Sequence, residues 1–313
     1  MKREVQRRRE RACACLSAVF LFLQSTAFIF VSRHTLRARA PKYETSAVIL
    51  AAELLKYSTC CVVVRHKHDT SKLDEIVTLA PAHLNMAVPS LLYTFQNKLS
   101  IYAVKYLAPT IYAVFSQSKV IYAALFTITF LQKKMSFRKL SAICTLAVGM
   151  ACVVTSEDTT SSQPRSQVEG GNILGICLLS VSCLLSGFNA TYLERIYSKD
   201  NTSIWVRNIQ LGTFAVPILM VEILVVSIMS SKSIFETCLV FDFWIAVLIG
   251  LQAFGGLIVG NVMKSLGAIM KCIIVAGSLL TTIMFDTCVR GASLNIMQWC
   301  GVAMVASSVV VYQ

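Results

Sequence analysis

The chain has 313 residues, of which 56% are hydrophobic and only 14% are charged, and its mean hydropathy is +0.66. A soluble domain carries about 25% charged residues, so this composition excludes an ordinary water-soluble protein and indicates a multi-pass membrane protein. The net charge of +13 divides between loops beside apolar segments and a few cations within those segments. The excess of basic residues is therefore a topology signal, and nucleic-acid binding is not expected.

Ten apolar segments are long enough to cross a bilayer as helices, which need roughly 17–25 residues. Helices are expected because backbone polar groups in lipid must be satisfied within the segment. In chain order, the predicted spans are 12–32, 45–64, 82–104, 109–131, 137–155, 172–193, 205–229, 242–262, 268–288 and 292–312. The sequence thus predicts an all-α integral membrane protein with ten transmembrane helices.

The first span follows a strongly basic segment, Met1 to Arg11. Its apolar run is about twice as long as the core of a signal peptide, and no small-residue cleavage site follows it, so we interpret it as a retained helix. With ten spans, both termini lie on one side of the membrane. The loops on that side carry the excess of Lys and Arg, so both termini are expected in the cytosol.

A stretch rich in Ser, Thr, Gln and Gly, residues 156–171, interrupts the apolar pattern and has the composition of a linker. It separates residues 1–155, which hold the basic N-terminus and five spans, from residues 172–313, which hold five more. Related halves with an odd number of spans insert in opposite orientations, the plan of many secondary transporters with inverted repeats. Ten helices without internal symmetry are the alternative. In the orientation above, the linker lies in the lumen.

Lys119 lies near the middle of the span 109–131, with Tyr112 and Ser116 on the same helix face. A lysine at the centre of a membrane helix costs about 2.5–3.5 kcal/mol on insertion scales, so it marks a substrate path or a buried ion pair. Lys271, at the start of the ninth span, supplies a second cation from the other half of the chain. Two lysines that converge on one cavity would suit a diphosphate, because each offers a compact charge and several donors.

A second polar stripe follows the third span, where Ser90, Tyr93, Gln96 or Asn97, and Ser100 recur at helical spacing. The amides can pair with the edge of a nucleobase, and Tyr93 can stack on its ring. The alternative is that these side chains hold helices together, at roughly 0.6–2 kcal/mol each. The pattern alone leaves both interpretations open.

Lys56 has a different interpretation, because Glu53 lies three residues earlier on the same helix face and predicts a structural ion pair. The 12 cysteines show no disulfide framework or zinc-ligand spacing, and the four histidines do not cluster within the spans, so no metal or cofactor is expected. The chain also has no His-Glu-x-x-His, no paired intramembrane aspartates and no Asp-x-Asp on a loop. An enzyme is therefore not expected.

Several short motifs are specific as a set through their order and spacing. They are residues 88–97 (VPSLLYTFQN), Tyr112 with Gln117-Ser-Lys119, Ser186-Gly-Phe188 with Tyr192-Leu-Glu194, residues 205–210 (WVRNIQ), and Phe254-Gly-Gly256 leading to Ile269-Met-Lys271. Over most of its length, the chain thereby resembles the nucleotide-sugar transporters of the Golgi and endoplasmic reticulum. The resemblance is strongest to the branch that carries CMP-sialic acid, UDP-galactose and UDP-N-acetylglucosamine.

The resemblance implies a drug/metabolite transporter fold of two inverted five-helix repeats, and antiport of a cytosolic nucleotide sugar for a lumenal nucleoside monophosphate. It implies residence in the Golgi membrane, with the endoplasmic reticulum as the alternative. The implied substrate-binding residues are Tyr93, Gln96 and Asn97 at the nucleotide, Tyr112, Lys119 and Lys271 near the phosphates, and Asn208 from the seventh helix. Further candidates are Ser186, Asn189, Tyr192 and Lys98.

The chain departs from the family pattern at three places. Lys98 stands where a second amide commonly follows Gln-Asn, Ser265-Leu-Gly-Ala268 stands where Tyr-x-Asp-Asn commonly precedes the ninth-helix lysine, and Gly212 stands where some relatives have a ligand-facing Tyr. These differences remove polar contacts and add a charge. The sugar and the base therefore stay open.

A UDP-sugar such as UDP-galactose or UDP-N-acetylglucosamine is the favoured substrate. CMP-sialic acid, or a non-nucleotide organic anion carried by another member of the superfamily, is the alternative. The expected partners are a nucleotide sugar, a nucleoside monophosphate and membrane lipids. A homodimer or a complex with glycosyltransferases is the candidate assembly, and no nucleic acid is expected.

Overall fold

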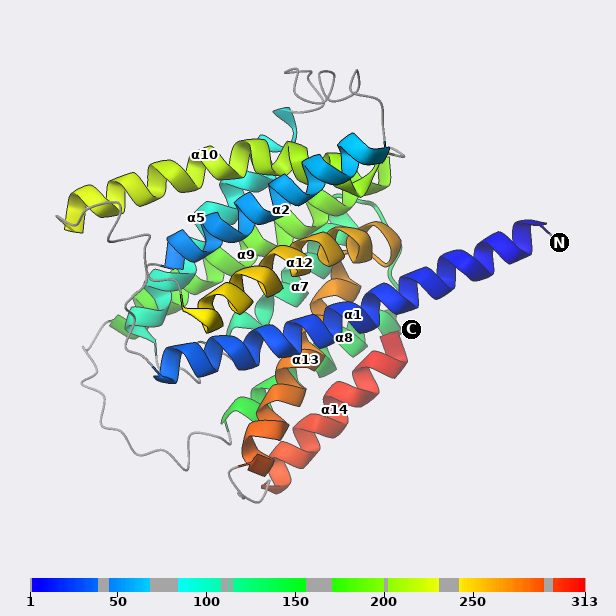
Figure 1. Ribbon diagram of the computed structural model, residues 1–313. Coiled ribbons are helices and arrows are strands. Elements are labelled where there is room, and N and C mark those ends of the chain that lie inside the picture. Colours follow the sequence, from blue (N-terminus) through cyan, green and yellow to red (C-terminus); the bar gives the residue numbers. More distant parts are fainter. Residues whose placement is uncertain are drawn as a thin grey trace. The chain divides into compact units, whose positions relative to one another are not determined.

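The computed structural model describes residues 2–38, 45–67, 84–107, 112, 115–155, 171–199, 202–230, 242–289 and 295–312. Within these stretches the chain forms ten α-helices and no strand. Figure 1 labels the helices. The all-helical architecture expected from hydropathy is therefore observed. Residues 156–170 of the expected linker lie outside the described residues.

Each predicted span overlaps one helix. Among the described residues, five helices are long and apolar enough to cross a membrane: α1 (Lys2–Ala38), α2 (Thr45–Lys67), α9 (Gly171–Lys199), α10 (Ile204–Ser230) and α12 (Phe243–Ser265). The others are α5 (Ala87–Tyr106), α7 (Ser118–Thr129), α8 (Phe137–Thr155), α13 (Ala268–Val289) and α14 (Ile296–Tyr312). Many large apolar side chains remain exposed on these helices, which is typical of a protein whose outer surface meets lipid.

The largest differences from the starts of the predicted spans are at α1 and α7. α1 starts at Lys2, so the basic N-terminal segment and the first span form one continuous helix, whose apolar part is Ala12–Ser32. The fourth span, expected over 109–131, is represented by α7, which begins at Ser118 after a turn at Gln117. Lys119 is therefore in the first turn of α7, and the described residues just before it, Phe115 and Ser116, are also helical.

The chain forms two compact units, and each combines residues from both sides of the expected linker. Unit 1 contains residues 1–94 and 196–266, and unit 2 contains residues 95–195 and 267–313. The boundaries fall within α5 and α9, so these two helices each contribute to both units. The two units are described separately below.

In unit 1, α1 lies beside α12, and α2 packs on both α12 and α10 (Figure 1). Apolar residues of α2 and α12 form the core: Val48, Ala52, Ile245, Leu248, Ile249 and Ala253. Polar contacts then join α1 to α12, because the Gln24 amide donates to the carbonyl oxygen of Leu251 at 2.8 Å and the Asn261 amide donates to the Ser17 hydroxyl at 2.6 Å. Such hydrogen bonds hold membrane helices together where lipid offers no polar partner.

In unit 2, α8 packs along α14, and α7 contacts both α8 and α13. Its core contains Val120, Ala123, Ala124, Ile143, Leu146, Met150, Val153, Ile269, Cys272, Ile273, Ala276, Leu280 and Val305. α8 and α14 approach most closely at two glycines, since a Cβ atom on Gly301 would lie 2.6 Å from the carbonyl oxygen of Gly149. Small residues at such crossings let backbones approach and increase van der Waals contact. This core holds α7 against α13, the helix that carries Lys271.

Candidate functional site

Lys119 and Lys271 lie in the same unit, in the first turns of α7 and α13, two helices that contact each other. Both side chains are partly buried, and their ammonium groups are within electrostatic reach of each other. Like charges repel more strongly in a protein interior than in water, because the effective dielectric constant is lower. An anion within reach of both lysines would therefore stabilise the arrangement.

The start of α7 lies beside this charge, and one of its first N–H groups, that of Val120, donates to the carbonyl oxygen of Gln117 at 3.0 Å. The first N–H groups of a helix have no partner within the helix, and the macrodipole gives that end roughly half a positive charge. Gln117, the residue before α7, makes no side-chain hydrogen bond that caps it. In membrane transporters, the N-termini of interrupted helices commonly face anionic substrate groups. An anion near Lys119 would therefore meet both an ammonium group and the positive end of a helix.

The start of α13 is different, because a carboxylate from α9 already caps it. Oε2 of Glu194 accepts a hydrogen bond from the backbone N–H of Ala268 at 2.7 Å. Oε1 of the same carboxylate pairs with the ammonium group of Lys133, which lies in the connection between α7 and α8. Lys271 follows the capped residue by three positions, so the first turn of α13 carries both the capped N–H group and a partly buried cation.

Gln96 brings a buried acceptor to unit 2. Its backbone carbonyl accepts a hydrogen bond from the Ser182 hydroxyl at 2.8 Å, which ties α5 to α9. Its side chain is only 9% exposed, and its Oε1 atom has no hydrogen-bond partner within the described part of the chain. A buried acceptor without a partner costs about 1–3 kcal/mol, so a ligand that donates a hydrogen bond to Gln96 would gain that energy. The adjacent Asn97 is partly buried.

Tyr112 is held beside α5 by a hydrogen bond. Its phenol oxygen lies 2.7 Å from the hydroxyl of Ser100, and its ring packs on a cluster that includes Leu107 and Leu179. The Tyr112 side chain is half-buried. Lys98, on the same helix as Ser100, is exposed.

The three candidates on α9 have unequal surroundings. Asn189 is buried and Ser186 is partly buried, and both lie close to Gly187, where a Cβ atom would meet the backbone nitrogen of Ala123 at 2.8 Å. α7 and α9 therefore approach closely beside these two side chains. The ring of Tyr192 instead lies in an aromatic cluster with Phe130 and Phe188, at centroid distances of 6.3 and 5.9 Å. The Tyr192 ring therefore has aromatic packing partners, and its role at a ligand stays a prediction.

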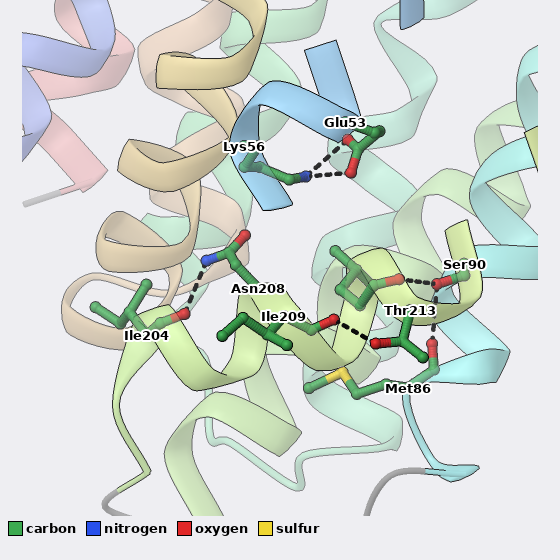
Figure 2. A network of polar contacts seen from close by, with 9 residues as sticks. Glu53, Lys56, Met86, Ser90, Ile204, Asn208, Ile209 and Thr213 are labelled. Carbon is green, nitrogen blue, oxygen red and sulfur yellow. Dashed lines mark hydrogen bonds and ion pairs between the residues drawn. The ribbon is translucent and has the colours of Figure 1, made fainter. Parts of the chain in front are cut away.

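The remaining two candidates, Tyr93 and Asn208, belong to unit 1. Tyr93 is exposed on α5, whereas Asn208 is 1% exposed on α10. Figure 2 shows that the Asn208 amide donates to the carbonyl oxygen of Ile204 on its own helix, at 2.9 Å. The Ser90 hydroxyl bridges α5 and α10, because it contacts the carbonyl oxygens of Met86, labelled in Figure 2, and of Leu211, each at 3.1 Å. α5 and α10 are thus fixed to each other beside Tyr93.

Glu53 and Lys56 form an ion pair on α2, shown in Figure 2, with distances of 2.6 and 2.7 Å from the lysine nitrogen to the two carboxylate oxygens. Lys56 is buried and lies against Gly256 of α12, where a Cβ atom would be 3.1 Å from the lysine Cδ. The glycine therefore leaves room for the lysine chain. The pair neutralises its own charge, in contrast to Lys119 and Lys271, which repel each other.

Unit 1 also contains a pocket of about 360 Å³ between α1, α10 and α12. Its walls are mainly apolar and include the rings of Phe20, Trp205 and Phe254, with Ser17 and Asn261 as polar groups. None of the predicted binding residues is among the described residues that line it. This pocket has the character of an apolar cavity and not of a phosphate site.

Glu194 is a further residue of this region, and the residue pattern alone predicts no role for it. Its motif, Tyr192-Leu-Glu194, contributes only to the family resemblance. The signal that could have found it is a single carboxylate at the end of a long apolar helix, because acidic residues in such places are expensive unless they are paired. Its partners could not be named from the sequence, because Lys133 and Ala268 lie 61 and 74 residues away.

Comparison with known proteins adds the family to this geometry. The chain matches the family described as nucleotide-sugar transporter over residues 9–313. It is 31% identical over 268 residues to the UDP-N-acetylglucosamine transporter of Canis lupus familiaris, covering 82% of this chain and 81% of that protein. It is 31% identical over 275 residues to the UDP-N-acetylglucosamine/UDP-N-acetylgalactosamine transporter nstp-4 of Caenorhabditis elegans, covering 82% and 80%.

A more distant relative is matched over a longer stretch. The UDP-galactose translocator of Mus musculus is 28% identical over 308 residues, covering 95% of this chain and 77% of that protein. A protein crystal structure with 8% sequence identity superposes with a TM-score of 0.69 over 96% of each chain. At that identity, the superposition shows a shared fold and nothing about the ligand.

Proposed function

Because the chain belongs to the nucleotide-sugar transporter family, we propose that it carries a UDP-sugar across the membrane in exchange for a nucleoside monophosphate. UDP-N-acetylglucosamine and UDP-galactose are the first candidates, since relatives over most of this chain's length are named for these substrates. The observation that carries the proposal is the pair of partly buried cations, Lys119 and Lys271, at the starts of two helices in contact. Such a pair suits the phosphates that a nucleotide sugar and its monophosphate share.

The proposed binding contacts divide by chemistry. Lys119 and Lys271 neutralise the phosphates, and the Tyr112 hydroxyl donates to them. The amides of Gln96 and Asn97 recognise the base, and the unpaired Gln96 oxygen supports this role because a nucleobase N–H can donate to it. The other proposed contacts are Tyr93, Asn208, Ser186 and Asn189.

Exchange follows from electrostatics in this proposal. Without a ligand, Lys119 and Lys271 repel each other, and the empty carrier changes its accessible side slowly. A bound phosphate compensates both charges and stabilises the state through which the carrier moves, since a ligand shifts an equilibrium only by its differential affinity for the two states. Both exchange partners carry a base and a phosphate, so both can use the same contacts.

The membrane arrangement is part of the proposal. Residues 1–155 and 172–313 form two inverted five-helix repeats joined by a lumenal linker at 156–171, with both termini in the cytosol. The carrier resides in the Golgi membrane and supplies lumenal glycosylation. The basic N-terminal segment and the loop charges support this orientation. The relatives named above are transporters, which supports transport rather than catalysis.

Thermal stabilisation of the purified protein tests the proposal. UMP, CMP, GMP and AMP and their sugar conjugates are compared at equal concentrations, because a ligand at about 100 times its dissociation constant adds about 2.7 kcal/mol of stability. We expect stabilisation by UMP and one or more UDP-sugars, followed by uptake of that UDP-sugar into liposomes preloaded with UMP. Stabilisation by CMP compounds alone would assign a different base. Folded protein that responds to no nucleotide would overturn nucleotide-sugar transport by this chain.

A further inference from the structure

Glu194 connects three segments of unit 2 through one buried carboxylate. Its side chain is near the cytosolic end expected for α9, and the residue is 2% exposed. One oxygen accepts the N–H of Ala268, and the other pairs with Lys133. A buried carboxylate is strongly disfavoured unless it is paired and hydrogen-bonded, and Glu194 is both. The end of α9 is therefore tied to the start of α13 and to the connection after α7.

The contact of Glu194 with the start of α13 involves the helix turn that carries Lys271. Gly267 precedes the capped residue and has φ of +90°, a conformation that residues with a Cβ atom rarely adopt. A Cβ atom at this position would lie 2.9 Å from Oε1 of Glu194, so the carboxylate rests directly against the glycine. The carbonyl oxygen of Gly267 then accepts the backbone N–H of Lys271 at 3.3 Å. Glu194, Gly267 and the backbone of Lys271 thus form a continuous set of contacts.

The part of α9 that carries the carboxylate is also held against α7 by contacts with aromatic rings. Arg195, the next residue on α9, places its guanidinium group 4.6 Å from the ring centroid of Phe130 at the end of α7. The ring of Phe188, on the same helix, contacts Phe126 and Phe130 at centroid distances of 5.4 and 5.7 Å. α9 is therefore fixed to α7 by aromatic packing and to α13 by the carboxylate. This arrangement sets where α13 begins relative to α7, and hence where Lys271 lies relative to Lys119.

We propose that Glu194 is a positioning residue for Lys271, whose carboxylate fixes the first turn of α13 so that the two lysines can bind one phosphate group together. The inference rests on the proposed function of the lysine pair. Glu194 does not touch the ligand. Its effect is specific to the phosphate, because it acts through the residue that binds the phosphate.

The test compares a ligand that has the phosphate with one that lacks it. UMP and uridine are measured for binding to the purified full-length protein, for Glu194→Ala and for Glu194→Gln. We expect Glu194→Ala to weaken the binding of UMP by about tenfold, which is the size of effect expected from losing a helix cap. The affinity for uridine should stay unchanged. Glu194→Gln keeps an acceptor for the Ala268 N–H, so its loss of UMP affinity should be smaller than that of Glu194→Ala.

A second variant reaches the same contact from the other side. Gly267→Ala places a methyl group against the carboxylate and strains the backbone. It should therefore also weaken the binding of UMP and leave the binding of uridine unchanged. Glu222→Gln is the matched control, because Glu222 is another carboxylate in an apolar helix, bonded to Ser46 at 3.0 Å in unit 1. It should leave the ratio of UMP to uridine affinity unchanged.

The outcomes separate the inference from the proposed function. If the wild-type protein binds neither UMP nor uridine, the proposed function fails and the inference with it. If the wild type binds UMP and the Glu194 variants bind it equally well, only the inference fails. Equal weakening of UMP and uridine in folded variants would also overturn the inference, because it would show a general structural role.

Discussion

The hydroxyl groups of Ser100 and Tyr112 lie 2.7 Å apart and join α5 to the segment that precedes α7. A hydroxyl group has one donor hydrogen and two acceptor lone pairs. Tyr112 can therefore accept a hydrogen bond from Ser100 and still donate its own hydrogen to a phosphate. The contact would hold the phenol in place for that purpose.

Replacing each hydroxyl should separate these two roles. Tyr112→Phe is expected to weaken UMP binding by roughly 10- to 150-fold, because a hydrogen bond to a charged group contributes about 1.5–3 kcal/mol. Ser100→Ala removes only the neighbouring contact and should weaken UMP by a smaller factor. Isothermal titration of both variants measures this difference. Equal effects would indicate that Tyr112 holds helices together and does not meet the phosphate.

Removing one lysine of the pair should affect the empty and the loaded protein in opposite directions. Lys271→Ala relieves repulsion with Lys119, so the free energy of unfolding without ligand should stay equal or rise by about 1 kcal/mol. The melting temperature should change in the same direction. The same variant should lose stabilisation by UMP and by the UDP-sugar alike, and Lys119→Ala should behave in the same way. Thermal scans with and without ligand provide both readings. Loss of only one ligand would contradict a shared phosphate site.

Removing the lysine of the ion pair on α2 should lower the stability of the protein without ligand, the opposite of the effect expected for Lys271→Ala. Lys56→Ala leaves Glu53 without its cation in a largely buried position, so stability without ligand should fall by about 3–5 kcal/mol. The double variant Glu53→Gln with Lys56→Met removes both charges and should recover most of that loss. Thermal denaturation of the three proteins checks the comparison. No recovery in the double variant would contradict an unpaired Glu53 charge as the cause of the loss.

Gly212 should be intolerant of a side chain for a reason specific to α2. A Cβ atom at this position would lie 2.7 Å from Cδ2 of Tyr57, so the tyrosine ring occupies the adjacent space. Gly212→Ala should therefore reduce stability by about 1–3 kcal/mol through overpacking. Tyr57→Ala in the same protein should restore part of the loss, because it opens that space. Additive losses in the double variant would contradict a direct clash.

The number and order of helices followed from hydropathy, because the bilayer sets both the length of a span and its composition. The break at Gln117 did not, since the residues around it, Phe115 to Ser118, include neither proline nor glycine. α7 packs against α8 and α13, which no short window of sequence contains. The hydropathy pattern therefore does not predict that Lys119 lies in the first turn of α7.

The polar stripes indicated which residues are unusual but not what each one contacts. Gln96 and Asn208 are both amides in apolar helices, yet the oxygen of Gln96 has no partner in the described part of the chain, whereas the amide of Asn208 donates to Ile204. Tyr192 is likewise a candidate for ligand contact in the sequence, and in the fold its ring packs beside Phe130 and Phe188. These differences arise from neighbouring helices, so they required the fold. The binding roles themselves stay predictions.

The close approach of α8 and α14 affects how variants of this protein should be interpreted. Cβ atoms at Gly149 and at Gly301 would lie 2.9 Å and 2.6 Å, respectively, from the carbonyl oxygen of the other glycine. Even alanine at either position would force the two backbones apart. A missense change there would abolish transport although it touches no proposed binding residue, and loss of the folded protein would be its cause. Protein abundance should therefore be measured before any such variant is assigned a defect in substrate recognition.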